Sequence, residues 1–254
     1  MFIGQIAMIG GMDPSGGAGL LRDAWTVEQR APKLEVHAVC TALTRQGEGR
    51  PASSASTDAV ALARELERIA GLERLRGIKL GMIPAEHVDA IDELLVRLRA
   101  RPNPPRIVCD PVGFASAGGR LGAPARELLR LAARVDLLTP NRAELAELLD
   151  AGPLPSGVAI LCKGEPVPDR PDRIRDRLCF ADGGEQVFER PRVSGPDPRG
   201  TGCALASAIA CELALGRSLI TAVAAGVAWL DGVRRRPVRV GDEWRLPLDP
   251  RGRS

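Results

Sequence analysis

Short apolar runs alternate with longer amphipathic segments along most of the chain. The apolar runs have strand length and lie at 2–10, 35–39, 77–82, 106–110, 135–139 and 158–164. Helical periodicity fills the segments between them, at 18–30, 57–71, 84–100, 122–134 and 141–149. Strands that alternate with helices are typical of a parallel sheet covered by helices on both faces. The pattern therefore predicts an α/β fold.

The pattern changes after residue 164. Segment 165–177, EPVPDRPDRIRDR, is rich in proline, aspartate and arginine and predicts a mobile loop. Segment 178–190 has two alternating runs around a Gly-Gly pair and predicts a small antiparallel hairpin. Two helices, near 200–215 and 218–234, and a short tail follow. Since α/β folds of this length often form one domain, we expect a single domain over residues 1–254.

Composition narrows the class of partner. The chain has 35 basic and 32 acidic residues, a net charge of +3, and both signs are spread along it, which does not indicate binding to nucleic acid or a membrane. It has no tyrosine and four phenylalanines, so aromatic platforms for stacking bases are lacking. No window reaches the ~18 apolar residues of a membrane span, and the first residues lack a basic signal region. We expect a cytoplasmic protein that acts on a small molecule.

Six cysteines lie far apart, without a CxxC pair, and the chain has two histidines, so a zinc cluster is not indicated. Four cysteines fall inside apolar runs and are interpreted as small buried hydrophobic residues in a reducing compartment. Cys203 differs, because it follows Gly200, Thr201 and Gly202 where a helix begins. It therefore needs a separate explanation.

The loop at 200–203 suits an anion. Small residues at a helix N-terminus leave backbone N–H groups accessible, and the helix dipole adds about half a positive charge there. The same position lowers the pKa of a thiol from its free value near ~8.5, so Cys203 could accept or relay a proton from an attacking hydroxyl. The alternative is a plain glycine-rich helix start, which the GxG pattern alone does not exclude.

Asn141 and Glu144 stand three residues apart at the start of another helix. They could form a helix cap, or hold Mg²⁺ through water with their oxygen atoms. Lys163 is predicted to end a buried strand nearby, where an ammonium group needs a negative partner. Asp23 follows the first glycine-rich loop and is either a solvated helix charge or a hydrogen-bond acceptor for a ligand. Each of these loops follows a strand, so they are expected at one edge of the sheet, where α/β proteins bind ligands.

These motifs, in order, carry a resemblance to a known family. DPSGGAG, TALTRQ, KLGM, DPV, TPNRAE, LCKGE and RGTGCALASAIA resemble the hydroxymethylpyrimidine and phosphomethylpyrimidine kinases of thiamine biosynthesis, in the ribokinase-like superfamily. The resemblance runs from about residue 3 to 233. Its most specific part is Gly-Thr-Gly-Cys, because the sugar kinases of the superfamily generally have aspartate where this chain has Cys203.

The resemblance implies a three-layer αβα ribokinase-like fold with a mostly parallel central sheet. It implies an ATP- and Mg²⁺-dependent kinase whose substrate is 4-amino-5-hydroxymethyl-2-methylpyrimidine, and it leaves open whether the monophosphate is a second substrate. The implied roles are catalysis by Cys203 with the anion loop Gly200, Thr201 and Gly202, pyrimidine binding by Asp23, Gln46, Met82 and Val112, phosphate contacts by Lys163 and Thr201, and Mg²⁺ positioning by Asn141 and Glu144.

The chain departs from the family pattern at four places. Ser116 replaces the usual lysine after DPV, Glu165 adds a negative charge near the expected phosphates, and Arg199 replaces a histidine before the glycine loop. The stretch between the helix at 141–149 and the next strand is too short for the helix that the family usually inserts. Two alternatives therefore stay open: a pyridoxal kinase, and a pyrimidine-binding protein without turnover. The sequence also leaves open whether the chain forms a homodimer.

Overall fold

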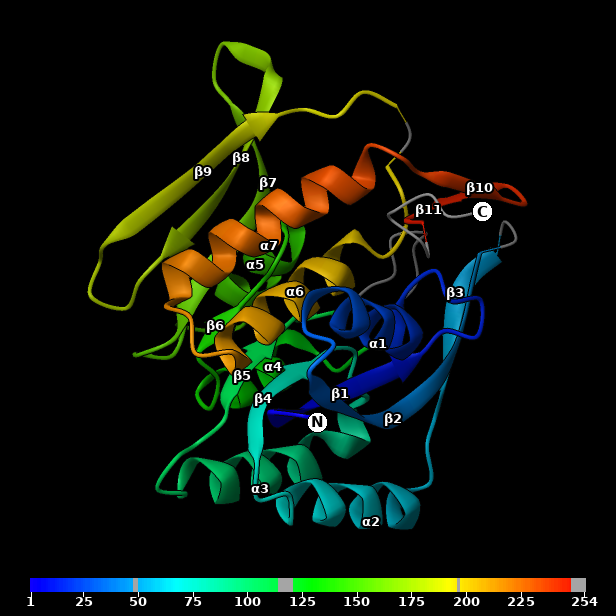
Figure 1. Cartoon of the computed structure of the whole chain (residues 1–254), viewed down its shortest axis with the longest axis vertical. Helices are drawn as coiled ribbons and strands as arrows, with labels where there is room; N and C mark the ends of the chain where they lie inside the picture. Colours follow the sequence, from blue (N-terminus) through cyan, green and yellow to red (C-terminus); the bar gives the residue numbers. More distant parts are fainter. Residues whose placement is uncertain (48–49, 114–120, 196, 248–254) are drawn as a thin grey trace.

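A nine-stranded sheet with helices on both faces forms the body of the molecule (Figure 1). The computed structural model describes residues 1–47, 50–113, 121–195 and 197–247, without the side chains of 46, 47, 50 and 51. The strand order is β3-β2-β1-β4-β5-β6-β7-β8-β9. Pairing is parallel from β2 to β7 and antiparallel at both ends of the sheet. The predicted ribokinase-like αβα arrangement with a mostly parallel sheet is confirmed.

The strands of this sheet are β1 (Gly4–Met12), β2 (Leu34–Gly47), β3 (Arg50–Ser56), β4 (Leu75–Leu80), β5 (Arg106–Cys109), β6 (Leu137–Leu138), β7 (Ala159–Val167), β8 (Arg170–Cys179) and β9 (Glu185–Pro191). The helices are α1 (Gly19–Arg30), α2 (Ala59–Ala70), the 3₁₀ turn η1 (Ala85–His87), α3 (Val88–Arg99), α4 (Ala125–Ala132), α5 (Arg142–Ala151), α6 (Thr201–Ala214) and α7 (Leu219–Arg234). A separate hairpin, β10 (Val238–Val240) and β11 (Glu243–Arg245), follows α7.

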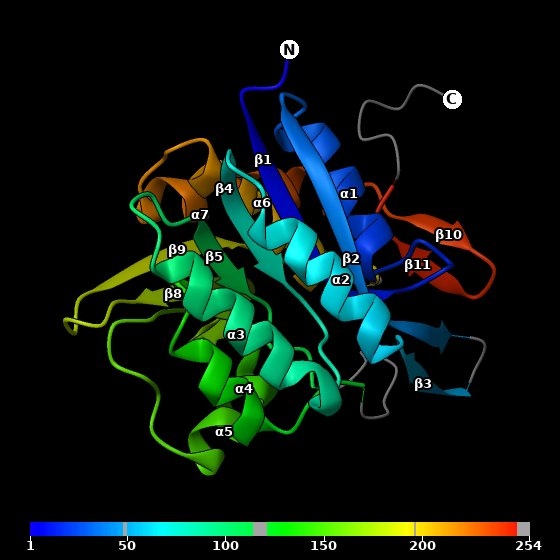
Figure 2. The same ribbon diagram turned by 90° about the horizontal axis from the view of Figure 1, so that it is seen from below.

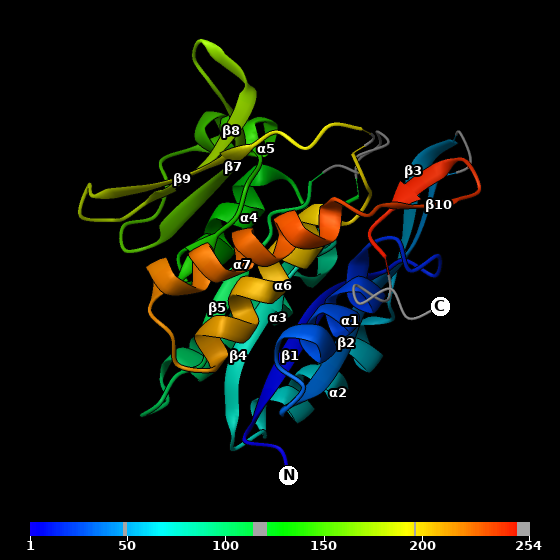
Figure 3. The same cartoon turned by 45° about the horizontal axis from the view of Figure 1, so that its top comes forward.

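The central strands are buried on both faces, which explains their continuous apolar runs. In β1, Ile6 and Met8 pack into the cluster formed with α1, α6 and α7, while Ala7 and Ile9 face the cluster formed with α2, α3, α4 and α5. Figure 2 shows the second group of helices on one side of the sheet, and Figure 3 shows α6 and α7 side by side on the other. The sheet thus separates two hydrophobic cores.

One prediction of local structure was wrong. Segment 165–177 is not a mobile loop, because β7 and β8 run through it as an antiparallel pair. The buried positions of β8, Ile174, Asp176 and Leu178, do alternate. The middle one is an aspartate that pairs with Arg190, so the alternation does not appear as an apolar pattern in the sequence. The short tail predicted after 234 contains the β10–β11 hairpin.

Among the described residues, no helix is both long enough and apolar enough to span a membrane.

Candidate functional site

A cavity of about 630 Å³ opens at the edge of the sheet where the parallel strands end. Its wall includes every predicted site residue whose side chain is described: Asp23, Met82, Val112, Asn141, Glu144, Lys163, Gly200, Thr201, Gly202 and Cys203. The side chain of Gln46 and the whole of Ser116 lie outside the described residues. The structure therefore brings residues from distant parts of the chain to one place, as the position of the loops predicts.

The glycine loop opens α6 and requires its glycine. Gly200 is the N-cap residue with φ +82°, and a Cβ atom there would lie 2.1 Å from the carbonyl oxygen of Gly17 in the first loop. Thr201, Gly202 and Cys203 form the first turn, whose backbone N–H groups have no acceptor inside the helix. The first loop and the anion loop therefore lie against each other at the cavity wall.

Lys163 faces this loop from β7. Its Nζ atom lies 2.8 Å from Oδ1 of Asp110, and would be 3.4 Å from a Cβ atom built on Gly202. The register of β7 shifts between Cys162 and Glu165, and such a bulge re-aims a side chain. Burial disfavours the charge of Asp110, but the ammonium groups of Lys163 and Lys79 outweigh it and hold the pKa of Asp110 below its ordinary value. An ion pair thus stands beside the anion loop.

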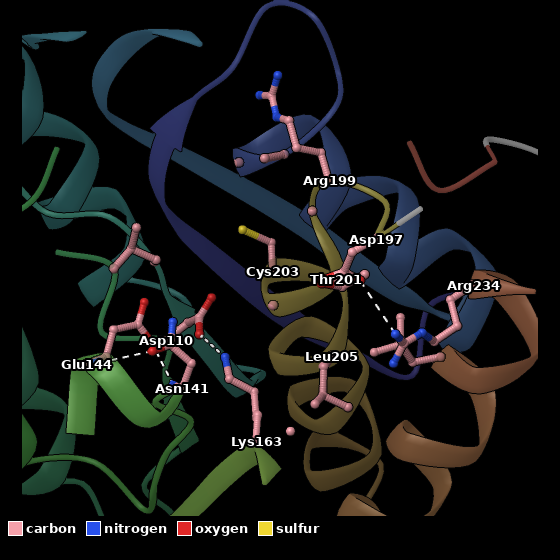
Figure 4. A pocket seen from close by; sticks show the side chains of 18 of the residues that line it. Asp110, Asn141, Glu144, Lys163, Asp197, Arg199, Thr201, Cys203, Leu205 and Arg234 are labelled. Carbon is pink, nitrogen blue, oxygen red and sulfur yellow. Dashed lines mark hydrogen bonds and ion pairs between the residues drawn. The ribbon is translucent and has the colours of Figure 1, made fainter. Parts of the chain in front are cut away.

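Asn141 and Glu144 form a capping box at the start of α5. The Glu144 N–H donates to Oδ1 of Asn141 at 3.0 Å, and the Asn141 N–H donates to Oε2 of Glu144 at 2.8 Å. Burial and the carboxylate of Asp110 raise the pKa of Glu144 to about 7. Figure 4 shows Asp110, Asn141, Glu144 and Lys163 gathered on one side of the α6 N-terminus.

This group of side chains fits Mg²⁺ in its chemistry. It offers carboxylate and amide oxygens, which Mg²⁺ prefers. No group of three or more histidine, cysteine or acidic side chains that could hold a metal occurs within the described part of the chain. Mg²⁺ would therefore keep much of its water here.

The thiol of Cys203 differs from expectation. Burial, with a smaller contribution from the carboxylates of Asp23 and Asp110, raises the pKa of this thiol to about 11. The ammonium group of Lys79 lowers the pKa, but its effect is smaller than that of burial. The predicted lowering by the helix N-terminus is therefore wrong, because the half-buried thiol is desolvated among carboxylates. Cys203 is a neutral thiol at pH 7.

Sequence reasoning missed a fully buried lysine in the cavity floor. Lys79, on β4, places Nζ 2.8 Å from Oδ2 of Asp23, and Ser207 on α6 donates to Oδ1 of Asp23 at 2.8 Å. The side chains of Lys79 and Asp23 are each 1% exposed, so the interpretation of Asp23 as a solvated helix charge is wrong. The feature of the sequence that could have revealed this buried ion pair is the lysine inside the apolar run of 77–82. Contact between Asp23 and a substrate stays a prediction.

Two departures from the family pattern now have structural explanations. Glu165 is held between Arg175 and Arg177, and hydrogen bonding to Arg177 lowers the pKa of Glu165. Its charge is thus balanced on the sheet, and it does not line the cavity. Arg199 pairs with Asp13 and Glu243, and its side chain points away from the Lys163 group (Figure 4).

The cavity wall continues on the other side of the α6 N-terminus, where Figure 4 shows Leu205, Asp197 and Arg234. The wall also includes Ile174, Leu230, Arg190 and Arg192. Nη2 of Arg234 lies 3.5 Å from Oδ1 of Asp197 (Figure 4). Arg190 and Arg234 already pair with carboxylates, so this part of the wall combines apolar side chains with paired guanidinium groups.

The fold and the glycine-loop site together define a ribokinase-like protein. The sequence profile described as phosphomethylpyrimidine kinase matches residues 13–249, and the chain belongs to that family. It is 34% identical to the hydroxymethylpyrimidine/phosphomethylpyrimidine kinase of Salmonella typhimurium, over 87% of each chain.

Two further comparisons show how much of each similar protein this chain covers. The chain is 29% identical to the thiamine biosynthesis multifunctional protein ThiED of Corynebacterium efficiens, over 91% of this chain but 33% of that protein, so it spans about a third of that relative's length. The pyridoxal kinase from Staphylococcus aureus in complex with AMP-PCP superposes with a TM-score of 0.82 at 20% identity, over all of this chain and 96% of the other. That likeness shows the fold.

Proposed function

We propose that this chain is an ATP-dependent kinase that phosphorylates the hydroxymethyl group of an aminopyrimidine, 4-amino-5-hydroxymethyl-2-methylpyrimidine. The observation that carries the proposal is the single cavity in which the anion loop 200–203 faces the Lys163–Asp110 pair and an apolar wall with Met82 and Val112. Phosphoryl transfer needs alignment and positive charge more than covalent help from the protein. The cavity offers both beside a slot for a flat ring.

Each part of the site has a role in this proposal. The backbone N–H groups of the anion loop stabilise the charge that develops on the transferred group, and Lys163 adds a positive charge. The substrate hydroxyl forms the new O–P bond while the bond to the departing ADP breaks, and the hydroxyl proton passes to the thiolate form of Cys203. Met82 and Val112 enclose the ring, and Asp23 and Gln46 hold its polar groups.

Asn141 and Glu144, with Asp110 nearby, would hold Mg²⁺ through water. The ion supplies positive charge that neutralises the phosphates of the nucleotide. Glu144 keeps its place through the capping box, so its free oxygen is oriented before any ligand binds.

The decisive experiment is an ADP-release assay with the hydroxymethylpyrimidine, its monophosphate and pyridoxal in parallel. We expect kcat/KM to be highest for one of the two pyrimidines, and the comparison of these two decides whether one or both transfers occur. Preference for pyridoxal would replace the proposal with a pyridoxal kinase. Calorimetric binding of the pyrimidine without ADP release would show a binding protein without turnover.

The Mg²⁺ role has its own test in Glu144→Gln, which keeps the size and the cap but removes the charge. We expect kcat to fall and to recover partly at higher Mg²⁺, because the weakened site is then filled by mass action. Asp150→Asn is the matched control, since Asp150 is exposed on the same helix and does not line the cavity. Equal activity of Glu144→Gln and wild type at all Mg²⁺ concentrations would leave Glu144 as a helix cap.

A further inference from the structure

Three segments far apart in the sequence meet behind the anion loop. They are the first loop at 13–18, Arg199 directly before Gly200, and the β10–β11 hairpin with the residues that follow it. The Arg199 N–H donates to the carbonyl oxygen of Trp244 at 2.8 Å. The figures show the hairpin at the same end of the molecule as β3 (Figures 1 and 3).

The guanidinium group of Arg199 bridges two carboxylates. Its Nη1 atom donates to both oxygens of Glu243, at 2.9 and 2.8 Å, and its Nη2 atom pairs with Asp13. Asp13 is 1% exposed, so its charge is buried and needs this partner. The planar guanidinium group of an arginine can donate to two carboxylates at once, whereas the compact ammonium group of a lysine lacks this forked geometry.

Asp13 links Arg199 to the first loop. Its oxygens accept hydrogen bonds from the backbone N–H groups of Ser15 and Ala18, each at 3.0 Å. Between these residues lies Gly17, whose carbonyl oxygen faces Gly200 too closely for any side chain there. The position of Asp13 therefore determines how near the first loop stands to the anion loop.

The hairpin and the residue after it are joined to the first loop by further contacts. Nη1 of Arg245 donates to the carbonyl oxygen of Ser15 at 2.7 Å, and Nη2 of Arg22 donates to the carbonyl oxygens of Gly16 and Leu246, both at 3.1 Å. These bonds connect the hairpin with the loop through backbone atoms. Nη2 of Arg245 also pairs with Glu243, at 3.0 Å, but the Arg22 bonds do not involve Glu243, so they still join the two segments when the Glu243 charge is removed.

The approach to Gly200 lacks regular structure. No helix or strand occurs at the described residues between Pro191 and Gly200, apart from the isolated bridge of Arg199 with Arg245. Directly before Gly200, Arg199 is held to the hairpin through its backbone and to Asp13 and Glu243 through its side chain.

We propose that Arg199, Asp13 and Glu243 form a clamp that positions the anion loop for phosphoryl transfer, and that the C-terminal hairpin is part of the catalytic apparatus. This inference rests on the proposed kinase function. Arg199 and Glu243 are positioning residues, since they act through the backbone of 200–203. The arginine that replaces the family's histidine has its partner in the hairpin of this same chain.

The test compares Glu243→Gln with the neighbouring control Asp242→Asn. Asp242 is fully exposed on the same hairpin, and its ion pair with Arg239, at 3.8 Å, is a surface contact of little energetic weight. We expect Glu243→Gln to lower kcat by about 10- to 100-fold, as expected when reacting groups are misplaced, with the KM for the pyrimidine within about twofold of wild type. Asp242→Asn should match wild type.

Amide hydrogen exchange of a peptide covering 199–203 gives a readout that needs no activity. We expect faster exchange in Glu243→Gln and in Arg199→Lys, which keeps the charge but loses the fork. Unchanged exchange and unchanged kcat in both variants would overturn the clamp. A lower melting temperature with wild-type kcat at 25 °C would also overturn it, because that is the result expected for a purely structural ion pair. If wild type releases no ADP with any substrate, the proposed function fails while exchange still decides the clamp.

Discussion

Cys203 shows how strongly the environment of one residue changes its chemistry. A thiol at a helix N-terminus is ordinarily more acidic, but here burial and two nearby carboxylates raise its pKa to about 11. Only a small fraction is thiolate at pH 7, and that fraction grows as pH rises toward the pKa. If the thiolate accepts the substrate proton, the reaction rate must follow the same curve.

We therefore expect wild-type kcat to rise about tenfold per pH unit from pH 7 to 9, at saturating Mg²⁺ and substrates. Cys203→Ala should lower kcat by about 10²–10⁴ and flatten this dependence. The measurement is the pH profile of initial rates for both proteins. If the wild-type profile is flat and Cys203→Ala keeps full activity, Cys203 does not accept the substrate proton.

At the scale of single elements, the start of α6 carries the most demanding geometry. Gly200 adopts φ +82° and touches Gly17, whereas Gly216, just beyond the other end of α6, adopts φ +87° with nothing within 4 Å of an added Cβ atom. Both glycines have a left-handed backbone conformation that would strain any other residue, but only Gly200 is also enclosed. Their comparison separates strain from close approach.

Gly216→Ala should cost about 1–2 kcal/mol of unfolding free energy, the usual strain of a left-handed residue, and leave kcat unchanged. Gly200→Ala should cost more and also lower kcat by about 100-fold or more, because the anion loop must move away from Gly17. Urea unfolding and steady-state kinetics of both variants measure these effects. Equal losses in the two variants would show that the contact with Gly17 does not matter.

The elements differ in how far the sequence predicts them. The apolar runs of β1, β4 and β5 are predictable because strands buried on both faces have few polar positions. The antiparallel strands β7 and β8 were missed in part, because their inward positions include Glu165 and Asp176, which are compensated by arginines on neighbouring strands. Such compensation is tertiary and leaves no local pattern.

The residues of the site show the same limit. Loops that follow parallel strands must meet at one edge, so the sequence could predict that Asn141, Lys163 and Cys203 line one cavity. The partner of Lys163 could not be predicted, because Asp110 reaches it across the sheet. The pKa of Cys203 likewise depends on Asp23 and Asp110, which are neighbours only in the folded chain.

At the scale of the whole molecule, the Lys79–Asp23–Ser207 group joins the sheet to α1 and α6 beneath the cavity. An ion pair this deeply buried is unusual, since hydrophobic residues of similar volume often give equal stability. Removal of one partner leaves the other charged and desolvated. The group therefore couples the stability of the layers to the charge of the cavity floor.

Lys79→Met should lower the free energy of unfolding by about 3–5 kcal/mol, because it leaves Asp23 unpaired, and Lys79→Met/Asp23→Leu should recover much of that loss. Arg97→Met, at the exposed pair with Glu67, should change stability little. Urea unfolding measures all three. A double variant as unstable as the single one would mean that the pair itself stabilises the fold.

The placement of α6 and α7 late in the chain has a consequence for synthesis. They cover the face of β1 that carries Ile6 and Met8, yet the ribosome makes Thr201 roughly 10–40 s after Met12 at usual elongation rates. During that interval the nascent sheet is covered on only part of this face, a surface that chaperones would recognise. The anion loop is made after Met82, Val112 and the residues proposed for magnesium, so a chain interrupted before Thr201 would hold those parts of the pocket without the turn proposed to receive the phosphate.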